Sequence, residues 1–351
     1  MAVAHIFRSV QALRAVAALL VVVNHALITA GHRSQIGVDG HPILGRLGVE
    51  IFFAISGFVM IRVTDPLRPG RAPIRTAGRF LWARAVRIVP LYWLCTMLVM
   101  LADLVGSRRS GDDVSPARLI ASLLFLPSTA ANGLVQPVLY VGWTLQFEMV
   151  FYLMVAIALA VQVSPVRLCV PVLAGLAALS TVRPPDSGAG WFYADSSTLS
   201  FAVGMLTARI AAPGPHRRAA WVVLVAATSA HVLVCGVRAV GPDPTGIVVA
   251  LVVPLIFVPT VMTEHRVGAS VPRWATAAGA TSYTLYLTHP FVSTAVADGL
   301  SALGDAARSP MLFVTAVVVT PLLTAPFIHR YVERPITRLP ATLVRRRPGP
   351  A

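Results

Sequence analysis

The chain contains no lysine and little charge of any kind, because charged residues fill only 12% of its positions. All 29 basic residues are therefore arginines, which outnumber 14 acidic residues and give a net charge of +15. This charge does not indicate nucleic-acid binding, because the arginines flank apolar segments and define no basic soluble domain. Apolar residues make up 56% of the sequence, and long apolar runs recur along it, as is typical of a polytopic helical membrane protein.

Cysteine is also scarce. Cys95, Cys169 and Cys235 fall inside apolar segments and have no metal-binding spacing. We therefore expect three buried thiols, no disulfide framework and no metal. A cleaved signal peptide is not expected either, because no small-residue cleavage site follows the first apolar run.

The apolar runs predict ten transmembrane helices, and with them an all-α polytopic integral membrane protein. The predicted spans are 10–30, 45–64, 86–106, 138–162, 167–183, 194–212, 219–237, 246–263, 281–302 and 311–330. Residues 119–126 are apolar but too few to cross, which favours a re-entrant or interfacial piece. We expect one membrane-embedded domain over residues 1–340, followed by a basic cytoplasmic tail over 341–351.

The placement of the arginines predicts which loops face the cytoplasm. Seven of them lie between the second predicted span and the start of the third: Arg62, Arg68, Arg71, Arg75, Arg79, Arg84 and Arg87. With ten spans, this loop, the later arginine clusters and both termini all fall on the cytoplasmic side. The intervening loops are poor in arginine, which supports the same orientation.

The first predicted span carries an arginine and a histidine, Arg14 and His25, among apolar residues. Eleven residues turn a helix through about three turns plus 20°, so the two side chains share one face, about 16 Å apart along the axis. Ionisable groups inside a membrane span are costly and indicate a functional site. A histidine can act as a general base, whereas an arginine can hold an anion. The alternative is that Arg14 reaches the interface and His25 bonds a neighbouring helix.

A carboxylate, Glu148, lies within the fourth predicted span. Such a group needs a partner, which Arg14 or His25 could supply. Gln146 lies nearby, and Tyr152 shares the face of Glu148 at the i+4 position. These residues favour a role in orienting the base or a substrate hydroxyl, and a structural ion pair between two helices is the alternative.

Four further residues are candidates for contact with a substrate or with the acyl donor. Glu50 lies near the outer end of the second span, where a water-filled mouth could hold it. Arg84 and Arg87 share a face at the start of the third span and can clamp phosphates, or else simply anchor the loop. His289 precedes Pro290, which frees a backbone carbonyl one turn back and often marks a cavity lining. A packing role is the alternative for Glu50 and His289, and we expect His231 to be structural.

Together these segments resemble the acyltransferase 3 family of integral-membrane O-acyltransferases, over nearly the whole chain. The motifs that carry the resemblance are Arg14-x10-His25, Gly48–Phe58, Arg84-x2-Arg87, Tyr283–His289 and Tyr331-Val332-Glu333-Arg334-Pro335. The sequence of residues 142–152 is most similar to that of the exopolysaccharide O-acetyltransferase (ExoZ-like) branch. The resemblance implies acyl transfer, most often of acetyl, from cytosolic acyl-CoA to a carbohydrate hydroxyl in the bacterial inner membrane. It also implies that His25 is essential and that Arg14 supports it.

We therefore expect His25 to take the hydroxyl proton, oriented by Glu148 or Asn24, while Arg84 and Arg87 hold the phosphates of acetyl-CoA. Direct transfer and an acyl-histidine intermediate both remain open. The expected partners are acyl-CoA, a carbohydrate acceptor, the lipid bilayer and polysaccharide-assembly proteins, with no nucleic acid. A transporter or flippase for a lipid-linked sugar is the main rival, although no repeated halves are seen. A non-catalytic scaffold is a third reading.

Overall fold

The structure is a computed structural model that describes residues 7–34, 42–67, 72–104, 114–184, 187–238, 244–302 and 309–338. These residues form helices, short 3-10 turns and one isolated β-bridge between Thr129 and Val135. The helices are α1 (Arg8–Ser34), α2 (Pro42–Thr64), α3 (Pro73–Leu104), α4 (Pro116–Leu123), α5 (Trp143–Ala160), α6 (Pro165–Leu179), α7 (Thr198–Ala211), α8 (Arg217–Arg238), α9 (Thr245–Met262), α10 (Glu264–Val267), α11 (Arg273–Ala302) and α12 (Pro310–Ile328). The predicted all-α polytopic membrane fold is confirmed.

Eight helices of the described chain are long and apolar enough to cross a membrane: α1, α2, α3, α5, α6, α8, α9 and α12. The two other predicted spans differ from these in length or polarity. α7 is apolar but has 14 residues, and α11 has 30 residues but carries buried polar groups, including Thr288 and His289. The count of ten spans and the cytoplasmic position of both ends stay predictions, and residues 341–351 lie outside the described chain.

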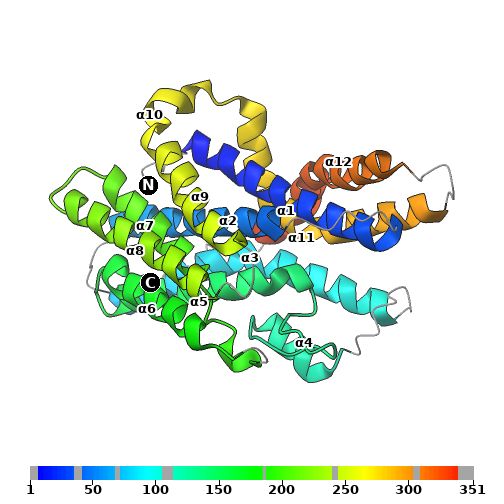
Figure 1. The fold of residues 1–351 in the computed structure, drawn as a ribbon, viewed down its shortest axis with the longest axis horizontal. Helices are drawn as coiled ribbons and strands as arrows, with labels where there is room; N and C mark the ends of the chain where they lie inside the picture. Colours follow the sequence, from blue (N-terminus) through cyan, green and yellow to red (C-terminus); the bar gives the residue numbers. More distant parts are fainter. Residues whose placement is uncertain are drawn as a thin grey trace, which may run out of the picture.

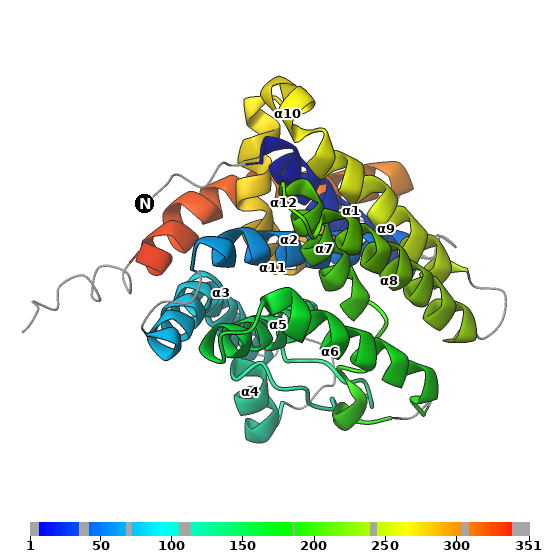
Figure 2. The same cartoon turned by 90° about the vertical axis from the view of Figure 1, so that its left-hand side faces the viewer.

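Helix α2 runs through the middle of the molecule. It packs against α1, α7 and α9, while α1 packs in turn against α11 and α12, and α3 against α5. Figures 1 and 2 show α2 between α1 and α9 on one side and α3 and α5 on the other. Residues far apart in the sequence, from α1, α2, α3, α5 and α11, therefore meet at the centre.

Small residues let these helices approach closely. A Cβ atom at Gly57 of α2 would lie 2.1 Å from the carbonyl oxygen of Phe201 in α7, and one at Gly204 would lie 1.8 Å from that of Ala54. Each glycine thus admits the backbone of the other helix, as in membrane helix pairs with small residues at the contact.

The short apolar piece around residues 119–126 forms α4 and the turn after it. An eight-residue helix rises about 12 Å and cannot cross a bilayer core of about 30 Å. Side chains from the long helices hold it in place. Trp93 Nε1 of α3 donates to the Leu123 carbonyl at 2.9 Å, and Gln146 Nε2 of α5 donates to the Leu126 carbonyl at 2.8 Å. The segment lies against α3 and α5 rather than adding a span.

Candidate active site

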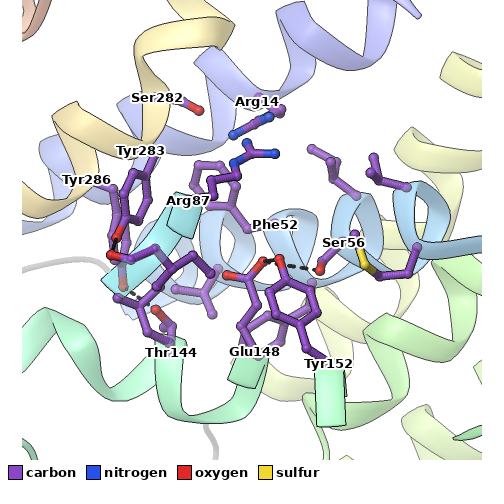
Figure 3. A pocket seen from close by; sticks show the side chains of 17 residues that line it. Arg14, Phe52, Ser56, Arg87, Thr144, Glu148, Tyr152, Ser282, Tyr283 and Tyr286 are labelled. Carbon is purple, nitrogen blue, oxygen red and sulfur yellow. Dashed lines mark hydrogen bonds between the residues drawn. The ribbon is translucent and has the colours of Figure 1, made fainter. Parts of the chain in front are cut away.

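A cavity of about 90 Å³ lies between α1, α2, α3, α5 and α11, and we call it the arginine cavity. Its polar lining comprises Arg14, Ser56, Arg87, Thr144, Glu148, Tyr152, Ser282, Tyr283 and Tyr286. Figure 3 shows Arg14 and Arg87 facing one another across this space, with Glu148 and Tyr152 on the α5 side. The cavity therefore joins residues predicted separately in three distant segments.

Neither arginine of this cavity has a protein partner in the described chain. Arg14 and Arg87 make no hydrogen bond or ion pair there, and the Nε atom of Arg14 is buried without an acceptor. Two guanidinium groups that face one another repel, and a buried charge needs a counter-charge or hydrogen-bond acceptors. Ser282 adds a buried hydroxyl with no partner in the same cavity. This lining suits an anionic ligand that accepts hydrogen bonds.

The structure places Glu148 in the arginine cavity but not in contact with His25. Its Oε1 atom accepts hydrogen bonds from the hydroxyls of Ser56, at 3.2 Å, and of Tyr152. Within the described chain it makes no ion pair with an arginine, although it lies across the cavity from Arg14 and Arg87 (Figure 3). The i+4 relation to Tyr152 is present as predicted. The carboxylate balances part of the positive charge of the cavity.

A second cavity, of about 350 Å³, contains His25, and we call it the histidine cavity. Its polar lining comprises Asn24, His25, Arg46, Glu50, Trp143, Asp195 and Ser197. Val49 and Tyr286 line both cavities, so the two spaces are adjacent and share a wall. Arg14 and His25, which share a face of α1, thus belong to different but neighbouring chambers.

His289 of α11 is the hydrogen-bond partner of His25. The Nδ1 atom of His25 lies 2.9 Å from Nε2 of His289, and the two rings stack with centroids 5.0 Å apart. Neither Glu148 nor Asn24 bonds the ring, so the orienting partner expected from the sequence is replaced by His289. The Tyr140 ring packs nearly perpendicular to the His25 ring, with centroids 5.4 Å apart, and further limits its motion.

Pro290 explains why this histidine pair has a defined tautomer. Proline has no backbone N–H, so the carbonyl of Tyr286, four residues earlier, lacks its usual helical donor. The Nδ1 atom of His289 lies 2.8 Å from that carbonyl oxygen, and a carbonyl can only accept. With both rings neutral, His289 Nε2 is then an acceptor, His25 Nδ1 carries a proton, and His25 Nε2 keeps its lone pair. This arrangement leaves Nε2 of His25 free to accept a proton.

Two other predicted site residues lie outside both cavities. Arg84 lies over the Phe80 ring, 5.9 Å from its centroid, and Gln146 anchors the segment after α4. Glu50 lines the histidine cavity but is fully buried, and it pairs with Arg46 at 2.9 Å. His231, expected to be merely structural, lies 3.7 Å from the same carboxylate and belongs to its polar setting.

The sequence prediction missed several residues of the histidine cavity. Arg46 lies four residues before Glu50, a spacing that could have indicated the ion pair. Asp195 and Ser197 come from the start of a predicted span, where polar residues are common and carry little information. Trp143 was seen only as part of a motif. Their shared position depends on how α1, α2, α5 and the segment before α7 pack.

Two comparisons with known proteins match most of the chain. Residues 7–330 match the acyltransferase domain family. The chain is also 31% identical, over 323 residues, to a protein of Rhizobium meliloti (strain 1021) named exopolysaccharide production protein ExoZ. That alignment covers 90% of this chain and 94% of the relative. No solved structure matches the chain.

Proposed function

The chain belongs to the acyltransferase 3 family of acyl-transferring membrane enzymes, and on this premise we propose its substrates. The proposed reaction moves an acetyl group from cytosolic acetyl-CoA to a hydroxyl of a cell-surface or secreted polysaccharide, or of its lipid-linked precursor, at the bacterial inner membrane. The acceptor class is carried over from the name of the R. meliloti relative, to which the chain is similar over almost its full length.

The observation that carries this proposal is the adjacency of the two cavities. One presents unpaired arginines, which suit a polyanionic donor, and the other presents a histidine whose Nε2 atom makes no hydrogen bond in the described chain. A transporter for a lipid-linked sugar has no need of a tautomer fixed by a proline and a second histidine. The shared wall at Val49 and Tyr286 brings donor and acceptor chambers to one point, as a two-substrate transfer requires.

The arginine cavity fits the donor. Arg87 is exposed and places one end of the cavity at the surface, on the predicted cytoplasmic side. Phosphate oxygens of CoA would accept from Arg87 and Arg14, because guanidinium groups form strong charge-assisted hydrogen bonds with phosphate. Arg84, one turn before Arg87, raises the local concentration of the anion without lining the cavity. The rest of the arginine cavity is narrow, and it suits the thin arm of CoA that carries the thioester toward His25.

His25 supplies the base for the transfer. The acceptor hydroxyl attacks the thioester carbon, and its proton passes to Nε2 of His25. A C–O bond forms, the C–S bond breaks, and the proton passes from His25 to the departing thiolate of CoA. His289 Nε2 accepts from His25 Nδ1 throughout and stabilises the imidazolium while it carries the proton. An acyl-histidine intermediate would use the same Nε2 atom, and acyl label retained on the protein without acceptor would reveal it.

The first test compares O-acetyl ester in the surface and secreted glycans of a deletion strain that carries wild type, His25→Ala or His265→Ala. His265 is exposed on α10 and serves as the matched histidine control. We expect ester with wild type and His265→Ala, and at least a hundredfold less with His25→Ala at equal membrane levels, because a general base contributes about 10²–10⁴-fold. Equal ester from all three would contradict the proposal.

A further inference from the structure

The histidine cavity contains more polar side chains than a general base requires. Asn24 and Ser197 are 8% and 4% exposed, and their Oδ1 and Oγ atoms are buried with no hydrogen-bond partner in the described chain. Both residues line the cavity with His25. Buried polar atoms are almost always hydrogen-bonded, so two orphans beside one cavity indicate a ligand with several hydrogen-bonding groups.

We propose that this cavity is the acceptor subsite and that it binds one neutral sugar residue, with Asn24, Asp195 and Ser197 on its hydroxyls and Trp143 beside its ring. The inference rests on the proposed function and deepens it. A volume of about 350 Å³ lies within the range of small-ligand sites, about 300–1,000 Å³. A half-buried tryptophan next to a carboxylate and a hydroxyl gives the apolar face and the polar edge that a sugar ring needs.

The charge balance of the cavity favours a neutral sugar over an acidic one. The buried Glu50 is paired with Arg46, and it also accepts from Ser200 at 2.8 Å, so this ion pair contributes no net charge. Arg46 is engaged further, since it donates to Ser196 at 2.9 Å. Asp195 is then left as an excess negative charge in the lining. A uronate or a phosphate in the subsite would meet this carboxylate without a free cation to oppose it.

The Glu50–Arg46 pair has a distinct role in this arrangement. It joins α2 to the segment before α7 through Ser196, directly beside Asp195 and Ser197. Asp195 Oδ1 accepts from the backbone N–H of Ser197 at 2.9 Å, which fixes the turn that presents both side chains. The subsite is therefore held in shape before an acceptor arrives, and less binding energy is lost in ordering it.

The test measures acceptor binding without any donor. The probe is an oligosaccharide fraction cut from the source strain's own exopolysaccharide and freed of esters by mild alkali. Its Kd for the full-length protein in lipid nanodiscs is measured by isothermal titration calorimetry. We expect Ser197→Ala and Asp195→Asn each to raise the Kd about tenfold, the effect of one lost hydrogen bond to a ligand. The control variants Ser301→Ala and Asp103→Asn, on α11 and α3 outside the cavity, should leave it unchanged.

Turnover with radiolabelled acetyl-CoA then separates the two proposals. If the wild type binds the oligosaccharide and the cavity variants weaken binding, but no labelled ester forms, the proposed function fails and the subsite stands. If wild type forms ester and the cavity variants keep the wild-type Kd, or if the wild type shows no binding, the subsite is overturned. An unchanged KM for acetyl-CoA in Ser197→Ala and Asp195→Asn shows that these variants are folded. Octyl β-glucoside should compete with the oligosaccharide better than octyl β-glucuronide, and the reverse order would overturn the neutral-sugar class.

Discussion

At the scale of single residues, the position of one proton decides what His25 can do. Pro290 removes a helical donor from Tyr286, and His289 fills that vacancy with its Nδ1–H. The acceptor nitrogen left on His289 then holds the Nδ1–H of His25 at 2.9 Å. One missing backbone N–H is thus linked, through two rings, to the free Nε2 atom of His25, which we propose abstracts the substrate proton.

This chain of contacts predicts that His289 is a positioning residue, and the prediction has a testable signature. We expect His289→Leu to lower kcat about a hundredfold, because His25 loses the acceptor that fixes its tautomer, while KM for acetyl-CoA stays unchanged. His289→Gln should recover at least a third of the lost activity on a logarithmic scale, since its amide oxygen can accept and its amide N–H can donate. Steady-state kinetics on membranes with matched protein levels measures both variants.

His265→Leu, on the exposed helix α10, is the matched control and should be silent. A purely structural His289 would give a different pattern. In that case, His289→Leu and His289→Gln would both lose activity, each in proportion to its loss of folded protein. That result would contradict the positioning role.

The residue candidates show where sequence reasoning was sufficient and where it was not. Buried charge in an apolar segment is rare enough to single out Arg14, Glu148 and His25 without a structure. The contact partners of these residues could not be predicted from the sequence. His289 lies 264 positions from His25, and no local spacing indicates a contact between them. Arg84 and Arg87 share a face by spacing, yet only Arg87 lines a cavity, because the Phe80 ring lies under Arg84.

At the scale of helices, the α2–α7 crossing sets the position of the buried Glu50 and its neighbours. We expect Gly57→Ala to destabilise the protein by about 1–3 kcal/mol or more, because its Cβ would lie 2.1 Å from the Phe201 carbonyl oxygen. Gly175→Ala in α6 is the control, since no atom lies within 4 Å of its Cβ position and alanine favours a helix. Heating followed by size-exclusion chromatography in detergent gives the Tm of each variant. Equal Tm values for the two would mean that the helices do not pack this closely.

Most of the helices could be predicted from the apolar runs of the sequence. Two of them, α7 and α11, are borderline as predicted spans. Eight predicted spans are recovered as long apolar helices in the described chain. α7 has only 14 residues, and the chain before it turns at Asp195, which lines the histidine cavity. α11 is long but polar, since it supplies Ser282, Tyr286 and His289 to the site. α7 thus falls short of a span in length and α11 in apolar character, and both helices adjoin the residues of the site.

At the scale of the whole molecule, the two cavities are offset along the axis of α1. Arg14 and His25 are eleven residues apart on that helix, about 16 Å along its axis, and each lines a different chamber. A bundle with one chamber toward each membrane surface can receive a charged donor from one side and a sugar from the other. Neither substrate then has to cross the bilayer, which would be costly for a polyanion.

The arginine bias of the loops indicates which chamber faces the cytoplasm and leads to a prediction about sidedness. The arginine-rich loop between α2 and α3 leads into the first half of α3, on which Arg87 lies, so we expect the arginine cavity to open to the cytoplasm. Labelled acetyl-CoA added outside inverted membrane vesicles should therefore yield labelled ester at least tenfold faster than in right-side-out vesicles of equal protein content. Detergent permeabilisation should abolish the difference, because it gives the donor access to both surfaces. Faster labelling of intact right-side-out vesicles would instead place the arginine cavity on the outer face and reverse the proposed routes of donor and acceptor.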